Sequence, residues 1–238
     1  MAGVLALFGL FTTPLAAQDR YADSIDLALV LAVDTSTSVD HGEFRLQMIG
    51  IANAFRDSSV RYAIRAGAPL GLAVTLMQWS GAGDQVQAIP WTILRSDADI
   101  DAFAEQVSAV PRLVRGGRTA LGEAVAASLD LLAQVPLPAR RRVIDVSGDG
   151  GSNDGRLPRE ARELAKEAGV TVNGIAILNE EPRLDQYFAS DLITGVGAFQ
   201  VTATDYVDFA RAIRMKLVRE IMGTPIAWLG DMGEEPAR

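Results

Sequence analysis

The sequence contains one unbroken apolar run, Leu27-Ala28-Leu29-Val30-Leu31-Ala32-Val33, which leads directly into Asp34-Thr35-Ser36-Thr37-Ser38. An apolar run without alternation is typical of a central parallel strand covered on both faces, so we expect a strand over Ile25–Val33. One carboxylate and two hydroxyls, those of Asp34, Ser36 and Ser38, follow at alternate positions. Open α/β sheets bind ligands at the carboxyl ends of their strands, and such hard oxygens suit a hard cation such as Mg²⁺.

The composition allows a folded domain and excludes several classes of function. The 238 residues are 49% hydrophobic, which is enough for a sizeable core in one large domain or two small ones. A formal net charge of -8 argues against nucleic acid and anionic membranes as partners, because both are bound through Lys and Arg. The chain has no cysteine, which excludes disulfides, thiolate catalysis and iron–sulfur clusters.

The N-terminal residues predict export. Residues 1–17 carry no charged side chain, contain the apolar segment Val4–Phe11 and end in Ala16 and Ala17. This pattern is typical of a signal peptide cleaved after Ala17; a core helix or a membrane anchor is the alternative, but the segment is short for a membrane span. We therefore expect a signal peptide over 1–17, a short leader over 18–24 and a periplasmic or secreted protein without a later transmembrane segment.

Strands and helices are expected to alternate through residues 25–222. Pro90 lies inside one expected strand, Val86–Leu94, and proline is confined to sheet edges and bulges, so this strand belongs at an antiparallel edge. The last helix is expected over Asp205–Met222, and the tail from residue 223 to 238 is expected to be mobile. The fold class predicted is α/β: an open, mainly parallel, doubly wound sheet of about six strands with one antiparallel edge strand and helices on both faces. The other expected elements are a helix at Asp40–Asp57, strands at Leu70–Gln78, Arg140–Ser147, Val170–Leu178 and Ala198–Thr202, and helices beginning near Ser96, Leu121 and Pro158.

Two further segments carry oxygen ligands to the same edge of the predicted sheet. Thr119 follows Gly116-Gly117-Arg118 just before an expected helix, and Asp149 ends a later strand between two glycines. With water, the five side chains can surround a divalent cation, Mg²⁺ first and Mn²⁺ or Ca²⁺ as alternatives. The predicted metal ligands are Asp34, Ser36, Ser38, Thr119 and Asp149.

Together these segments resemble the metal-ion-dependent adhesion site of the von Willebrand factor type A domain family. Asp34–Ser38 fits its DxSxS pattern, Gly116–Ala124 its GG-x-T-x-x-G-x-A pattern and Ser147–Gly150 its strand-end aspartate. The domain is expected over residues 25–222. Leu121 replaces a threonine that is often found in the second segment. The chain also resembles a group of exported bacterial type A proteins without assigned function.

The resemblance implies how the site would bind a metal and a partner protein. The Asp and both Ser of the first segment hold the metal, Thr119 contacts it when ligand is bound, and Asp149 often acts through water. An Asp or Glu of a partner protein then completes the coordination shell. The leading hypothesis is an exported, metal-dependent protein-binding module that is not an enzyme.

Two other functional hypotheses stay open. One is a structural subunit whose metal site is vestigial or only stabilising. The other is a metal-dependent phosphate-ester hydrolase, but haloacid dehalogenase-type enzymes need a second Asp where Ser36 stands. The chain has no phosphate-binding G-x-x-x-x-G-K-[ST] loop and no G-x-S-x-G, and its single histidine, His41, argues against a Ser–His pair.

Some residues near the expected site have alternative interpretations. Trp79, Ser80, Asn179 and Glu180 follow or end strands and are candidates for a partner-binding rim, with core or ordinary loop roles as the alternative. Asp145 lies inside an otherwise apolar strand, where we expect a structural bond to an Arg or a hydroxyl.

Overall fold

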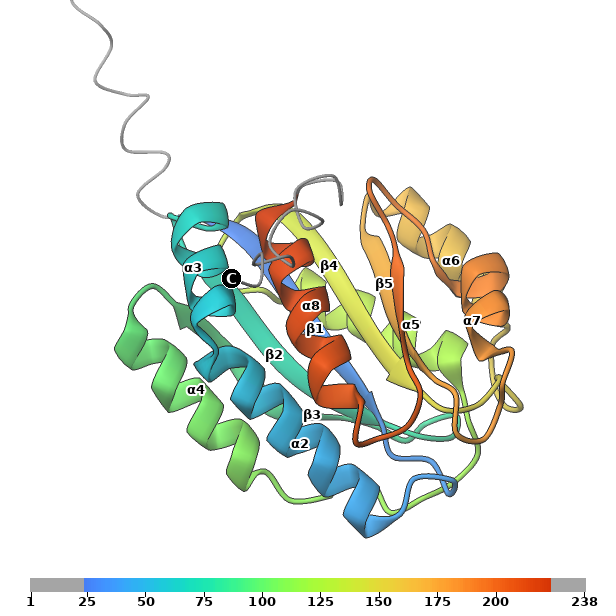
Figure 1. Ribbon diagram of the computed structural model, residues 1–238. Helices are drawn as coiled ribbons and strands as arrows, with labels where there is room; N and C mark the ends of the chain where they lie inside the picture. The colour runs from blue at the N-terminus through green and yellow to red at the C-terminus, as the bar shows by residue number, and fades with distance from the viewer. Residues whose placement is uncertain (1–23, 224–238) are drawn as a thin grey trace, which may run out of the picture.

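A computed structural model describes residues 24–223 of the chain, which form a six-stranded sheet between two layers of helices (Figure 1). The expected signal peptide, nearly all of the expected leader and the tail from residue 224 onward lie outside the described residues. The strands are β1 Ile25–Asp34, β2 Leu72–Trp79, β3 Gln85–Leu94, β4 Ala139–Gly148, β5 Thr171–Ile177 and β6 Gln200–Ala203.

The sheet has the order β3-β2-β1-β4-β5-β6, and only β3 runs antiparallel to its neighbour. This confirms the predicted fold class, including the antiparallel edge strand that contains Pro90. Every residue of β1 is buried, as expected of a strand with helices on both sides. Val33 pairs with Ser147 and Asp34 with Trp79, so the ends of β1, β4 and β2 meet at one edge of the sheet.

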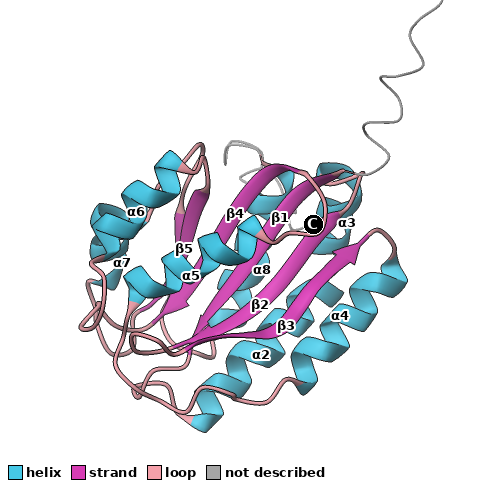
Figure 2. Ribbon diagram, turned by 180° about the vertical axis from the view of Figure 1, so that it is seen from behind, coloured by secondary structure: helices cyan, strands magenta, loops and turns pink. Residues whose placement is uncertain are grey.

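The helices divide between the two faces of the sheet. Figure 1 shows α2 His41–Arg56, α3 Ser58–Gly67, α4 Asp97–Ala109 and α8 Phe209–Met222 on the near face. Figure 2 shows the opposite face, where α5 Leu121–Ala133, α6 Pro158–Glu167 and α7 Leu184–Tyr187 lie. A separate cluster of buried apolar side chains fills each of the two layers.

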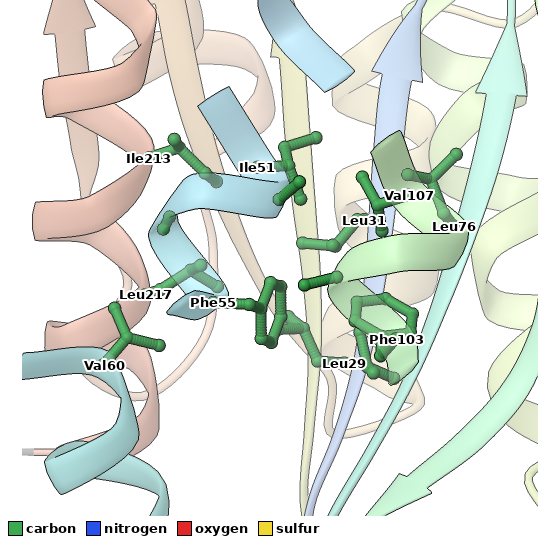
Figure 3. Packing of buried hydrophobic residues seen from close by; sticks show 14 of the residues in the cluster. Leu29, Leu31, Ile51, Phe55, Val60, Leu76, Phe103, Val107, Ile213 and Leu217 are labelled. Atoms are coloured by element: carbon green, nitrogen blue, oxygen red, sulfur yellow. The ribbon is translucent and has the colours of Figure 1, made fainter. Parts of the chain in front are cut away.

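The larger core packs α2 against the central strand (Figure 3). The rings of Phe55 on α2 and Phe103 on α4 meet edge to face with centroids 4.9 Å apart, a favourable geometry for aromatic pairs. Leu29 of β1 lies beneath this layer, and Leu217 of α8 closes the other side. The loop that precedes α2 therefore connects two elements that are packed into the core.

Three helical segments differ from the sequence prediction. The helix expected over Asp40–Asp57 ends at Arg56, and Asp57 caps a further helix, α3, by accepting a hydrogen bond from the Ser59 backbone N–H. The short helix α7, which continues as a π-turn over Phe188–Leu192, was not predicted. The last helix begins at Phe209 and not at Asp205, because residues 205–208 form a turn in which Asp205 accepts a hydrogen bond from the Asp208 N–H. None of the helices within residues 24–223 is both long enough and apolar enough to span a bilayer.

Candidate metal centre

The ends of the neighbouring strands β1 and β4 bring four of the five predicted ligands into one hydrogen-bonded chain. The Ser36 backbone N–H donates to Asp34 Oδ1 over 2.7 Å, and the Ser36 and Ser38 hydroxyl oxygens are 3.1 Å apart. Ser38 Oγ in turn donates to Asp149 Oδ1 over 2.7 Å. The two carboxylates, 115 positions apart in the sequence, are thus linked through Ser36 and Ser38.

Thr119 joins this group from the loop before α5. Its backbone N–H donates to Asn153 Oδ1 over 2.9 Å, and its carbonyl accepts from the Asn153 N–H over 2.8 Å. Within residues 24–223 no hydrogen bond involves its hydroxyl, which therefore remains available as a ligand. Thr119 and Ser38 both face an open hollow of about 320 Å³. The hollow is also lined by Thr37, Gly117, Gly150, Gly151, Asn153, Glu180 and Glu181.

The double glycine before Thr119 fastens two of the loops together. Thr37 Oγ1 donates to the Gly117 carbonyl and accepts from the Gly117 N–H, each over 2.9 Å. Gly116 and Gly117 have φ values of +75° and +135°, which residues with side chains rarely adopt. A Cβ at Gly117 would also approach Ser80 Oγ to 2.8 Å. The glycines therefore allow the first and second motif to touch.

Two polar side chains that no sequence motif marks hold the loop between β1 and α2 in place. The Arg112 guanidinium donates to the carbonyls of Thr35 (2.7 Å), Ser36 (3.2 Å) and Val39 (2.8 Å). Gln47, fully buried on α2, donates to the Asp34 carbonyl over 3.1 Å. Neither residue carries a motif, and only their position in the folded chain reveals what they do.

The electrostatics of the site favour a bound cation. Asp34 is completely buried, and within the described part of the chain its Oδ2 atom has no hydrogen-bond partner. Burial, followed by repulsion from Asp149, raises the pKa of Asp34 to about 7. Tyr206 Oη donates to Asp149 Oδ2 over 3.0 Å, and burial together with the Asp149 charge raises the pKa of this tyrosine. Two buried carboxylates without a counter-ion are costly, and a divalent cation would offset that cost.

The residues present fit a divalent cation that prefers oxygen. The donor set consists of two carboxylates and three hydroxyls, and within residues 24–223 no cluster of three or more His, Cys, Asp or Glu side chains offers a different kind of site. A cation here would depend on Ser36, Ser38 and Thr119 as well as on the carboxylates. A Cβ at Gly148 would lie 3.2 Å from Asp34 Oδ2, so this glycine keeps room beside the carboxylate oxygen that has no partner.

The predicted rim is only partly at the surface. Trp79 and Ser80 are fully buried, which corrects their placement on the rim; the Trp79 side chain belongs to the core and Ser80 Oγ donates to the Gly116 carbonyl. Asn179 and Glu180 are exposed, and Glu180 lines the hollow. Glu181, its neighbour, also lines the hollow and accepts the Gly151 N–H over 2.6 Å.

A protein-family model described as a protein of unknown function, DUF1194, matches residues 24–225. The chain belongs to this family. A search of curated proteins found no match. The DUF1194 assignment therefore gives the chain a family but no activity.

Solved structures place the DUF1194 chain in the von Willebrand factor type A fold. The pilus adhesin SpaC from Lactobacillus rhamnosus GG superposes with a TM-score of 0.60 at 13% identity, over 83% of this chain and 30% of that one. A von Willebrand factor type A protein from Catenulispora acidiphila gives 0.57 at 18% identity, over 84% of this chain and 43% of that one. Proximal thread matrix protein 1 from the mussel byssus, with a zinc-occupied MIDAS motif, gives 0.55 at 14%, over 82% and 46%. The chain thus spans between about a third and a half of the length of these proteins.

Proposed function

We propose that this protein is an exported binding module that uses a divalent cation to grip a carboxylate of a partner protein. The observation that carries the proposal is Asp34 Oδ2, a buried carboxylate oxygen without a hydrogen-bond partner in residues 24–223, beside a second carboxylate and three hydroxyls. Asp34, Ser36, Ser38, Thr119 and Asp149 are the residues that would hold the cation. The zinc-occupied MIDAS motif named for the mussel protein supports the assignment.

The hollow that two of these residues, Ser38 and Thr119, line suits a single acidic side chain. Its volume of about 320 Å³ lies at the lower end of the range for small-molecule pockets. Glu180 and Glu181 line it together with Ser38 and Thr119, so without a cation the hollow repels a carboxylate. When bound, the cation would supply the positive charge that attracts the partner's Asp or Glu. Metal dependence of binding follows from this arrangement of charges.

Mg²⁺ is the proposed cation because the donor set consists only of oxygen atoms, with Mn²⁺ and Ca²⁺ as alternatives. We propose a periplasmic or secreted location, which the charge-free apolar N-terminal segment and the similarity to a pilus adhesin support. The protein is proposed to act by binding and not by catalysis. Its lone histidine, His41, lies in the first turn of α2, and none of the contacts in the candidate site involves it.

The test compares the wild type with Asp34→Ala in two assays. Calorimetric titration with Mg²⁺ is expected to show one site in the wild type and none in the variant. Immobilised wild type in Mg²⁺ is expected to retain a partner that EDTA elutes, and Asp34→Ala is expected to retain none. Retention that is the same with EDTA or with the variant would refute the proposal. A melting temperature that depends on the metal, without any partner eluted by EDTA, would instead favour the hypothesis of a structural subunit.

A further inference from the structure

A second and larger hollow, the basic groove, lies at the opposite end of the sheet. Its volume is about 910 Å³, and it is lined by the first residues of β4 and β5, the ends of α6 and α8, and the loop before β6. Figure 1 shows the start of β4 and the end of α8 side by side at this end. Arg140 in the groove and Asp149 at the metal centre are nine positions apart, about 30 Å along an extended strand. The basic groove is therefore separate from the candidate metal centre.

Positive charge is concentrated in the basic groove, although the chain as a whole carries a net charge of -8. Arg140 forms an ion pair with Asp26 over 3.2 Å. Arg141 donates to the carbonyls of Glu220 and Ile221, each over 2.6 Å, and so closes the end of α8. The lining cations are Arg140, Arg141, Arg142, Lys166 and Arg219.

Arg219 differs from the other lining cations in its bonding within residues 24–223. Its guanidinium stacks over the Phe199 ring, 3.7 Å from the centroid, and it makes neither a hydrogen bond nor an ion pair with any residue between 24 and 223. Burial lowers the pKa of both Arg219 and Arg141, because both charges are partly removed from water. A carboxylate in the basic groove would compensate for the water that these charges have lost, because guanidinium and carboxylate form strong paired hydrogen bonds.

Apolar surface lies beside these charges. Val196, between Gly195 and Gly197, is 97% exposed, and it lines the basic groove together with Phe199. An occupant that has both apolar and acidic side chains would cover Val196 and pair with the arginines. A simple inorganic anion would not use this surface.

We propose that the basic groove is occupied by residues 224–238 of the same chain. Gly223, which itself lines the groove, ends α8 with a φ of +65°, so the segment begins at the groove. Fifteen residues can extend up to about 50 Å, far enough to reach any part of it. The segment supplies apolar residues first and carboxylates after them, in the combination that the groove presents. The apolar residues are Ile226, Trp228 and Leu229, and the acidic ones are Asp231, Glu234 and Glu235.

This intramolecular docking would cover Arg219 and Val196 and fasten the end of α8. The short covalent connection gives the segment a high effective concentration, so an acidic partner could use the basic groove only after displacing it. The proposal does not depend on the metal centre, and its failure would leave the proposed function unaffected.

Trp228 is the probe, because the full chain has only two other tryptophans, Trp79 and Trp91. The protein is labelled with 5-fluorotryptophan, and the ¹⁹F resonance of Trp228 is identified with Trp228→Phe. The solvent isotope shift between H₂O and D₂O then reports whether the Trp228 indole is exposed. Arg219→Gln is compared with the control Arg214→Gln, an exposed arginine on the same helix.

The wild type and Arg214→Gln are expected to show a Trp228 resonance without the isotope shift of an exposed indole. Arg219→Gln is expected to gain this shift, as is a triple variant that carries Asp231→Asn, Glu234→Gln and Glu235→Gln and changes no described residue. A full isotope shift in the wild type would overturn the proposal. So would a protected Trp228 that becomes exposed on dilution, because the occupant would then be a second copy. If Arg219→Gln does not fold, the triple variant alone decides.

Discussion

Two pairs of buried carboxylates in this protein differ in whether a lysine of the chain lies between them. Asp34 and Asp149 meet at the end of the sheet, and Asp145 and Glu220 meet between β4 and α8. In both pairs, burial and the neighbouring carboxylate raise the pKa of an aspartate, Asp34 or Asp145, to about 7. The second pair contains Lys216, whose ammonium lies 2.5 Å from Asp145 Oδ1 and 2.5 Å from Glu220 Oε1.

This difference indicates a structural role for the pair with Lys216 and a metal-binding role for the other pair. Lys216 is fully buried and ties α8 to the sheet, so this pair gains its cation when the chain folds. Asp34 and Asp149 have hydroxyls and a tyrosine around them but no Lys or Arg within salt-bridge distance among residues 24–223. A pair without its own cation is suited to an exchangeable one.

Removing the built-in cation is expected to have the largest effect. Lys216→Met leaves Asp145 and Glu220 buried together without compensation and should lower the free energy of unfolding by about 3–5 kcal/mol. Urea unfolding followed by circular dichroism measures this. The control is Lys166→Met, which breaks a surface pair with Glu163 and should cost at most about 1 kcal/mol. Equal losses in the two variants would show that the buried lysine is not needed.

At the metal centre, removal of a charge is expected to act in the opposite direction. Asp34→Asn eliminates a buried charge that no cation balances, and in EDTA at pH 8 it should raise the free energy of unfolding by about 1–3 kcal/mol. Its amide oxygen can still accept the Ser36 N–H. The same urea experiment applies. A destabilised Asp34→Asn chain would mean that the carboxylate already has a favourable partner.

The sequence predicts the place of the first carboxylate pair but not the lysine of the second. The apolar run of β1 and the three motifs predicted the sheet edge, because strand ends and glycines have strong local signals. The five metal-ligand positions stay a prediction. Asp145, placed inside an apolar strand, also indicated that a partner must exist. The prediction of an Arg or hydroxyl partner for Asp145 was wrong, because the partner is Lys216. Lys216 lies on a helix four residues before Glu220, and a lysine at such a position ordinarily faces water.

Tertiary contacts account for the other residues that the sequence did not reveal. Arg112 and Gln47 bond to backbone carbonyls, which any sequence supplies, so no motif marks them. Tyr206 belongs to the range predicted for the last helix, Asp205–Met222, but it lies in the turn before that helix and contacts Asp149. The position of Trp79 and Ser80 at a strand end predicts a rim, but Trp79 packs into the apolar core and Ser80 bonds to the loop that carries Gly116.

The pH dependence of stability should separate the two pairs. Raised pKa values mean that Asp34 and Asp145 bind more protons in the folded than in the unfolded chain between about pH 4 and pH 7, so their contribution to stability is lost as pH rises across that range. Each contributes up to about 1.4 kcal/mol per pH unit. Asp34→Asn in EDTA should show a shallower decline than the wild type, with the part due to Asp145 left. An unchanged slope would contradict the raised pKa of Asp34.

The smallest effect is expected from a single hydroxyl ligand. Thr119→Val keeps the shape of the side chain and should weaken Mg²⁺ binding by about tenfold, near 1.4 kcal/mol, while the stability of the metal-free chain stays the same. Thr37→Val is the matched control, because the Thr37 hydroxyl holds Gly117 through two hydrogen bonds and its loss should lower metal-free stability instead. Calorimetry and urea unfolding of both variants distinguish a ligand from a structural hydroxyl.

The claim that Asp34 and Asp149 bind an exchangeable cation is tested most directly by measuring proton release on metal binding. Mg²⁺ is titrated calorimetrically at pH 6 in two buffers of different ionisation enthalpy. Because a pKa of about 7 leaves Asp34 mostly protonated at that pH, binding should release close to one proton per Mg²⁺, and at pH 9 about none. Asp34→Asn should show no binding. Binding without proton release at pH 6, or equal Mg²⁺ affinity in Asp34→Asn, would contradict this account.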